Sequence, residues 1–154
     1  MASPADVEDR ESMLQLEQQM CFPIYASANA IVKTYRPLLE PLGITYPQYL
    51  VMMVLWEETP ISVGDIGRKL LLDSGTLTPL LKRLAAAGFV FRERDPSDER
   101  RVLIELTDKG HALKTEARDV PSSIIASAEL SDHERDDLKE AVTTLRRILL
   151  KKIP

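Results

Sequence analysis

The 154-residue chain is 44% apolar and 29% charged, as globular domains are, and its net charge of −4 argues against generic binding of polyanions. Its longest apolar run, residues 49–56, is far shorter than the roughly 20 residues of a membrane span, and the acidic N-terminus lacks the apolar segment of a signal peptide. A single cysteine excludes an intramolecular disulfide and, with two isolated histidines, a zinc site, so we expect a cytoplasmic protein with no cofactor and no metal.

The N-terminal third of the chain predicts two helices. Residues 13–39 predict a long helix that bends near Pro23, because proline removes one backbone hydrogen bond. Thr45 and Gln48 have the spacing of a capping box, which predicts that a buried helix starts there and continues through Glu57.

The middle of the chain predicts two more helices with a short break between them. The first begins at Ser62, which has the same capping pattern. The second, around Ser74, carries leucines at spacings of three and four, and Pro79 fits into it only if the helix begins near Thr76. Gly88 has the position of a C-cap glycine.

Two strands follow these helices. Residues 89–94 and 101–106 have strand-like composition, and the polar stretch 95–100 between them predicts a hairpin tip. Thr107 is expected to cap a further helix, which Pro121 stops.

The last predicted helix, residues 131–152, opens on a capping box and has an apolar seam at heptad-like spacing. Helix, break, helix and hairpin predict a winged helix-turn-helix over residues 45–107. The whole chain, 1–154, is then one domain that is mainly α with a small β-hairpin wing (α+β). The helices at 13–39 and 131–152 have apolar faces that one small core cannot cover, so we expect them to form a homodimer.

Candidate DNA-binding side chains gather in the second middle helix and in the hairpin. Short hydroxyls at the start of a recognition helix suit base edges, and a basic pair one turn later suits phosphates. Alternatively, the hydroxyls only cap the helix, and Lys82 and Arg83 only form a solvated face. The hairpin favours DNA, because an arginine at its tip can enter a narrow minor groove and Asp98 can hold Arg100 in place. The candidates are Ser74, Thr76, Thr78, Lys82, Arg83, Arg92, Arg94, Asp98 and Arg100.

Several stretches resemble a known family. The hairpin sequence DPSDERRVLIELTDKG, residues 95–110, is similar to the signature of the MarR family of winged-helix regulators. Residues 44–50, 72–84 and 21–27 resemble its organic-hydroperoxide-sensing subgroup, OhrR. The resemblance spans roughly residues 14–120. It implies a homodimeric repressor that binds a pseudo-palindromic operator in double-stranded DNA.

The single cysteine has two tyrosine neighbours on its predicted helix. Tyr25 and Tyr35 each fall within about 40° of Cys21 around a helix at 100° per residue, so the three share one stripe. Tyr35 is roughly 21 Å along the axis from Cys21, so its hydroxyl can reach only the cysteine of an antiparallel partner. A hydroxyl that donates to a thiolate favours this nucleophilic form. The alternatives are an inert, buried cysteine and tyrosines that only pack an interface.

The resemblance implies that Cys21 senses organic hydroperoxides and that Tyr25 and Tyr35 contact it across the dimer. Many relatives have a second, resolving cysteine and this chain has none, so it is similar to the one-cysteine type. Its sulfenic acid would then be capped by a low-molecular-weight thiol or oxidised further. Two alternatives stay open: a MarR-type repressor gated by a small aromatic ligand, and a thiol peroxidase. Neither a second cysteine nor a general base is visible near Cys21, so we expect a regulator rather than an enzyme.

Overall fold

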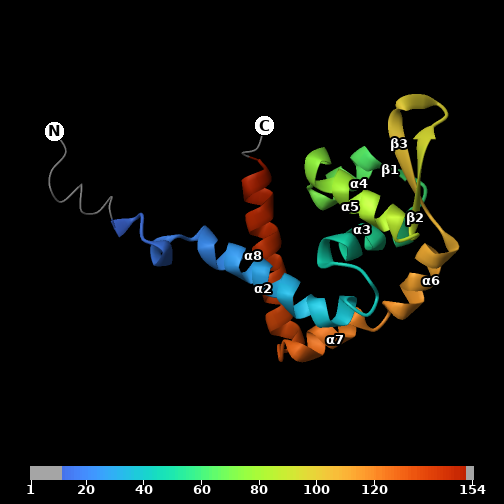
Figure 1. Cartoon of the computed structure of the whole chain (residues 1–154). Coiled ribbons are helices and arrows are strands. Elements are labelled where there is room, and N and C mark those ends of the chain that lie inside the picture. Colours follow the sequence, from blue (N-terminus) through green and yellow to red (C-terminus); the bar gives the residue numbers. More distant parts are fainter. Residues whose placement is uncertain (1–11, 152–154) are drawn as a thin grey trace, which may run out of the picture. The chain divides into compact units, whose positions relative to one another are not determined.

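The computed structural model describes residues 12–151, which form two compact units that divide between Ala117 and Arg118 (Figure 1). The acidic N-terminus and the last residue of the predicted helix 131–152 lie outside the described residues. The fold is mainly helical with one small antiparallel sheet, as predicted. No helix within the described part of the chain is long and apolar enough to cross a membrane.

The first long helix is shorter than predicted. A 3₁₀ turn, η1 (Leu16–Gln18), precedes α2 (Cys21–Leu39), so the prediction of one continuous helix over residues 13–39 is wrong at its N-terminal end. In a helix that continued from upstream, the ring of Pro23 would clash with the carbonyl group of Gln19. Pro23 instead lies in the first turn of α2, where its missing N–H has no helical partner to lose. The bend predicted at this proline is replaced by a helix start.

The central helix of the first unit is α3 (Tyr46–Glu57), and its predicted capping box is confirmed. The backbone N–H of Thr45 donates to Oε1 of Gln48 at 2.9 Å. The helix is apolar on most of its circumference, so it is buried among the other elements of the unit. Its fully buried side chains are Val51, Met52 and Leu55.

A short strand, β1 (Ile61–Ser62), leads directly into α4 (Val63–Leu70). The predicted cap is confirmed, because the hydroxyl of Ser62 accepts a hydrogen bond from the backbone N–H of Asp65 at 3.1 Å. The strand itself was not predicted. It consists of two residues and is stabilised by antiparallel pairing with the distant strand β3 (Asp98–Leu106), which no local pattern reveals.

Helix α5 (Ser74–Ala86) has Asp73 as its N-cap. The prediction that it begins near Thr76 is wrong, and Pro79 lies beyond the first turn. Pro79 is on an exposed side of the helix, so the carbonyl group of Gly75, which loses its helical donor, can bond to water.

The wing is a hairpin that follows α5. Gly88 ends the helix with φ +79°, which confirms the predicted C-cap glycine. β2 (Val90–Asp95) then pairs antiparallel with β3 in a sheet of order β1-β3-β2. Only residues 96–97 lie between the two strands, so the tip is shorter than the predicted 95–100, and Arg100 belongs to β3.

The base of the wing is fixed to α3 through α6 (Asp108–Glu116). Thr107 caps α6 as predicted, since its hydroxyl accepts from the backbone N–H of Gly110 at 3.0 Å. The indole Nε1 of Trp56 donates to the carbonyl oxygen of Gly110 at 3.0 Å. A Cβ at Gly110 would lie 2.1 Å from the carbonyl oxygen of Phe89, so this close approach requires glycine.

The second unit consists of α7 (Val120–Ser127) and α8 (Asp132–Leu150). The prediction that Pro121 stops the helix that begins at Thr107 is wrong, because α6 already ends at Glu116 and Pro121 lies in the first turn of α7, a helix that was not predicted. The capping box at the start of α8 is confirmed, with the backbone N–H of Ser131 donating to Glu134 at 2.9 Å. The apolar seam of α8 is exposed in the single chain at Leu138, Val142, Ile148 and Leu149.

Candidate functional site

The predicted recognition helix, α5, has one buried and one polar side. Its inward side carries Leu77, Leu81 and Leu84, which are all buried. The candidates Ser74, Thr76, Lys82 and Arg83 are exposed, and Thr78 is partly buried. The spacing of the leucines thus leaves these polar side chains on the face that is free to enter a DNA groove.

The first turn of α5 is closed by Asp73, which accepts two hydrogen bonds from Thr76. Oδ1 of Asp73 accepts from the backbone N–H of Thr76 at 2.8 Å, and Oδ2 accepts from the Thr76 hydroxyl at 2.9 Å. These hydrogen bonds hold the pKa of Asp73 below its ordinary value. The hydroxyl of Thr76 therefore takes part in capping the helix, as the alternative interpretation holds. Its proton points to Asp73, and its oxygen can still accept a hydrogen bond.

The wing arginines are exposed, as a role in DNA binding requires. Arg92 and Arg94 lie on β2, and Arg100 lies on β3. The predicted pairing of Asp98 with Arg100 is confirmed, because Nε of Arg100 lies 3.1 Å from Oδ1 of Asp98. The same contact lowers the pKa of Asp98. Even so, 91% of the Arg100 side chain is exposed, so the pair steadies the guanidinium without burying it.

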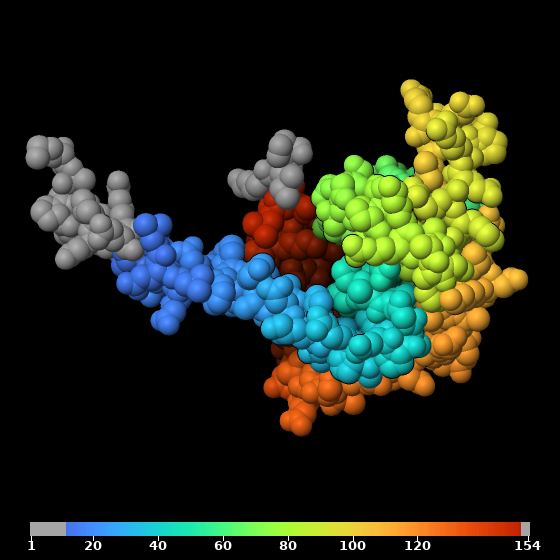
Figure 2. All heavy atoms as spheres, in the orientation of Figure 1, coloured from blue at the N-terminus to red at the C-terminus, as the bar shows by residue number. Residues whose placement is uncertain are grey.

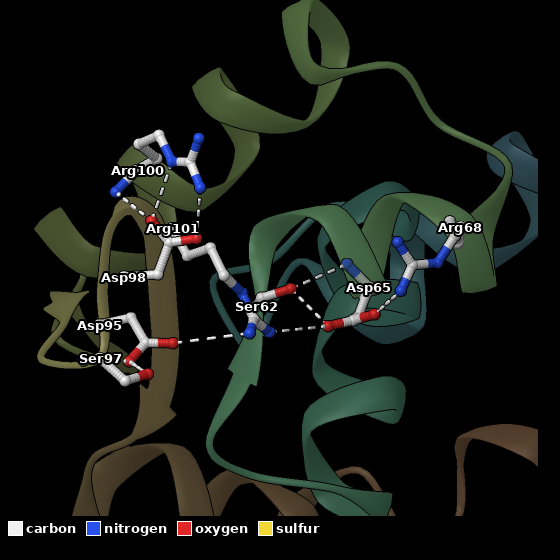
Figure 3. A network of polar contacts seen from close by, with 8 residues as sticks. All are labelled: Ser62, Asp65, Arg68, Asp95, Ser97, Asp98, Arg100 and Arg101. Carbon is white, nitrogen blue, oxygen red and sulfur yellow. Dashed lines mark hydrogen bonds and ion pairs between the residues drawn. The ribbon is translucent and has the colours of Figure 1, made fainter.

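Helix and wing candidates meet at an open cleft between α4, α5 and the wing. Thr78, Arg92 and Arg100 all line it, together with Arg68. Arg68 was not among the predicted site residues. It forms an ion pair with Asp65 (Figure 3), at a helical spacing of three residues that the sequence itself displays. The cleft therefore gathers positive charge from α4 and the wing, beside the carboxylate of Asp65, and α5 contributes the hydroxyl of Thr78.

Cys21 is exposed at the first residue of α2. Tyr25, one turn further on, is 67% exposed. The same helix exposes further apolar side chains, namely Phe22, Ile24, Ile31 and Val32. The alternative of a cysteine buried in the core of its own chain is therefore wrong, and the thiol stands beside an apolar surface.

Tyr35 belongs to a cluster of aromatic rings that the sequence prediction missed. Its ring centroid lies 4.5 Å from that of Tyr46 and 6.0 Å from that of Tyr49. Burial raises the pKa of Tyr35, and burial together with the neighbouring Tyr35 raises the pKa of Tyr46. Both hydroxyls stay protonated at neutral pH and can donate hydrogen bonds. Tyr35 lies fourteen positions after Cys21 on α2, so the two are not brought together within one chain.

Comparison with known proteins gives consistent results. The family model described as transcriptional regulator SarA/Rot matches residues 33–117. The organic hydroperoxide resistance transcriptional regulator of Bacillus subtilis is 44% identical over 146 residues, which cover 95% of this chain and 99% of that protein.

Solved structures of AbfR from Staphylococcus epidermidis are also similar to this chain. Reduced AbfR bound to DNA matches with a TM-score of 0.80 and 38% identity, over 94% of this chain and 99% of that one. Overoxidized AbfR bound to DNA matches with a TM-score of 0.73 and 39% identity, over 90% of this chain and 98% of that one.

Proposed function

Since this chain belongs to the MarR-type winged-helix transcriptional regulators, we propose that it is a repressor that leaves its operator when an organic hydroperoxide oxidises Cys21. One observation carries the proposal. An exposed cysteine opens an apolar helix in a chain whose other elements form a winged helix with a cationic cleft. The protein then acts in the cytoplasm, where thiols are kept reduced and DNA is accessible.

In the reduced state the protein binds double-stranded DNA through α5 and the wing. The polar side of α5 enters the major groove, and Arg100 reaches the neighbouring minor groove or its phosphates. The similarity to a regulator solved on DNA supports this assignment. Two copies are needed to read a pseudo-palindromic operator, with half-sites about 34 Å apart.

The homodimer is proposed from the exposed apolar surfaces. Both α2 and α8 present large apolar side chains to solvent in the single chain, which is costly unless another surface covers them. If two copies of α2 pack antiparallel, Tyr35 of one copy lies near Cys21 of the other. Its protonated hydroxyl can then donate to the thiolate and stabilise it.

The proposed sensing step is a two-electron oxidation of the thiolate. The sulfur of Cys21 attacks the terminal, hydroxyl-bearing oxygen of the hydroperoxide. The S–O bond forms as the O–O bond breaks, and the departing alkoxide takes up a proton to become the alcohol. A sulfenic acid remains. Since the chain has one cysteine, any disulfide must join it to another molecule. A low-molecular-weight thiol attacks the sulfenic sulfur, giving a mixed disulfide and water.

We assign DNA release to the mixed disulfide rather than to added oxygen atoms. For AbfR, an overoxidized form has been solved bound to DNA, so overoxidation is compatible with DNA binding in that relative. Emptying an operator requires a shift of about 5.5 kcal/mol between the binding and non-binding states, from 99:1 to 1:99. A bulky adduct wedged into a packed interface is better suited to supply this than one or two oxygens.

The test is a gel-shift titration of the wild-type protein with cumene hydroperoxide, with and without a small thiol, and with intact-mass analysis of every sample. We expect full release only when the mass increases by one thiol adduct at Cys21. Release without any mass change at Cys21 would contradict the proposal.

A small aromatic ligand is the second candidate signal, because a groove lies between α2 and the start of α3. It is lined by Val32, Arg36, Glu40, Ile44, Thr45 and Tyr46. Alkylation of Cys21 separates the two candidates. A ligand-gated repressor would still respond to its ligand after alkylation, whereas a peroxide-gated one would no longer respond to peroxide.

A further inference from the structure

We propose that Arg101 is a positioning residue. It fastens the wing to α4 and so holds the side chain of its neighbour Arg100 where it can contact DNA. The inference rests on the proposed DNA-binding function. It separates two adjacent arginines of β3 into different roles, one pointing to DNA and the other to the protein.

Arg101 lies between two carboxylates from different elements (Figure 3). Its Nη2 is 3.5 Å from Oδ2 of Asp65 in α4, and its Nη1 is 3.7 Å from Oδ2 of Asp95 at the end of β2. The planar guanidinium uses one nitrogen for each partner, which a lysine ammonium cannot reproduce. The side chain is 50% exposed, against 91% for Arg100.

Both carboxylates are also held in place by residues other than Arg101. Asp65 receives the hydroxyl proton of Ser62 on one oxygen and pairs with Arg68 through the other. Asp95 accepts the backbone N–H of Ser97 at 2.9 Å and so closes the tip of the wing. The pKa of Asp95 is lowered chiefly by its hydrogen bonds from Ser97, with a further contribution from the charge of Arg101. Arg101 therefore bridges two rigid points.

The wing needs such a bridge because, over most of its length, each of its two strands pairs only with the other. β1 pairs with β3 only at Ile104 and Leu103. Between Leu103 and the tip of the hairpin, the sheet therefore consists of β2 and β3 alone. An isolated two-stranded hairpin is marginally stable in water. Figure 2 shows the tip of the wing, in yellow, projecting beyond α4 and α5. Among the ion pairs of residues 12–151, the one between Arg101 and Asp65 joins this distal part of the wing to α4.

The direction in which one substitution changes the affinity for DNA distinguishes a positioning role from a purely electrostatic one. Asp65 carries negative charge beside a cleft that faces phosphates. If only charge mattered, Asp65→Asn would strengthen DNA binding, because it removes repulsion and frees Arg68. If Asp65 anchors the wing through Arg101, the same substitution weakens binding.

The experiment measures fluorescence anisotropy of a labelled duplex that the wild-type protein has selected from random-sequence DNA. We expect Arg101→Lys and Asp65→Asn each to weaken binding about fivefold, the effect of losing one or two exposed ion pairs. The slope of log K against log[KCl] should stay unchanged for both, because neither removes a phosphate contact. Arg135→Lys is the matched control. Arg135 also lies between two carboxylates, Asp132 and Asp136, but it is in α8, outside the proposed DNA-binding elements, so the affinity of this variant for DNA should stay within about twofold of the wild type.

Amide hydrogen exchange provides a readout that does not depend on DNA. In Arg101→Lys we expect faster exchange of the β2 and β3 amides that lie between Leu103 and the tip of the wing. Exchange in α3 and the melting temperature should be unchanged. Tighter binding by Asp65→Asn, or wild-type exchange in the wing of Arg101→Lys, would overturn the assignment. If the wild-type protein selects no DNA, the proposed function fails, and hydrogen exchange still decides whether Arg101 tethers the wing.

Discussion

Asp73 and Thr76 close the N-terminus of α5 with two hydrogen bonds, at 2.8 Å from the backbone N–H and 2.9 Å from the hydroxyl. This cap sits where the recognition helix meets DNA in the proposed function. Asp73 therefore affects both the stability of α5 and the position of Ser74 and Thr76 in its first turn.

We predict that Asp73→Ala lowers the melting temperature by about 3 °C, the shift expected when a helix of a domain of this size loses its N-cap. Asp73→Ser keeps an N-cap oxygen and serves as the control, with a melting temperature near that of the wild type. Differential scanning calorimetry measures both. Equal melting temperatures for wild type and Asp73→Ala would show that the cap does not stabilise the fold.

The charge of Asp73 gives a pH dependence of known sign. Because its pKa is lowered in the folded protein from 3.8, the stabilisation by its charge is present above that pH and is lost as the pH falls through the lower folded value. We expect the stability difference between wild type and Asp73→Asn to be constant from pH 7 to pH 5 and to shrink below about pH 4. Urea unfolding at each pH measures it. A difference that grows on acidification would contradict the prediction.

Arg100→Ala should weaken operator binding about tenfold while leaving the dimer and its melting temperature nearly unchanged. Its exposed guanidinium contributes little to the fold, since its partner Asp98 is on the same strand. If the side chain contacts phosphate, the salt slope should fall by about one unit. Unchanged affinity at physiological salt would remove the wing from DNA recognition.

Tyr35→Phe should slow the oxidation of Cys21 about tenfold, the ratio that corresponds to losing a hydrogen bond of about 1.5 kcal/mol to a charged acceptor. Binding of DNA by the reduced protein should be unaffected, because phenylalanine keeps the ring that packs against Tyr46. Tyr46→Phe removes a hydroxyl from the same cluster and is the matched control. Stopped-flow measurement with cumene hydroperoxide compares the two; equal rates would make Tyr35 a packing residue only.

Local features of the fold were predictable from the sequence, and non-local ones were not. The caps at Thr45 and Ser131 depend on residues three positions away, so their pattern was sufficient. Strand β1 was missed because two residues carry no periodicity and depend on pairing with β3. Pro23 and Pro121 were misread, since a proline that disrupts a helix interior is equally suited to its first turn.

The candidate site shows the same limit. The exposed polar side of α5 followed from the spacing of its leucines, and the pairing of Asp98 with Arg100 followed from their proximity in sequence. The different environment of Arg101 was not predictable, because its partner Asp65 is far away in the chain. Tyr35 illustrates a further point, since its helical stripe was visible but its ring contacts with Tyr46 and Tyr49 required the folded chain.

The central claim is that Cys21 is the switch, and the Cys21→Ser variant tests it most directly. Serine has a similar size and hydrogen-bonding capacity, but its hydroxyl has no accessible anion near neutral pH and is not oxidised by peroxide. In a gel-shift titration with cumene hydroperoxide and a small thiol, we predict that Cys21→Ser binds the operator as tightly as the reduced wild type and stays bound at every peroxide concentration that releases the wild type. Dissociation of the variant with the dose response of the wild type would show that Cys21 is not the sensor.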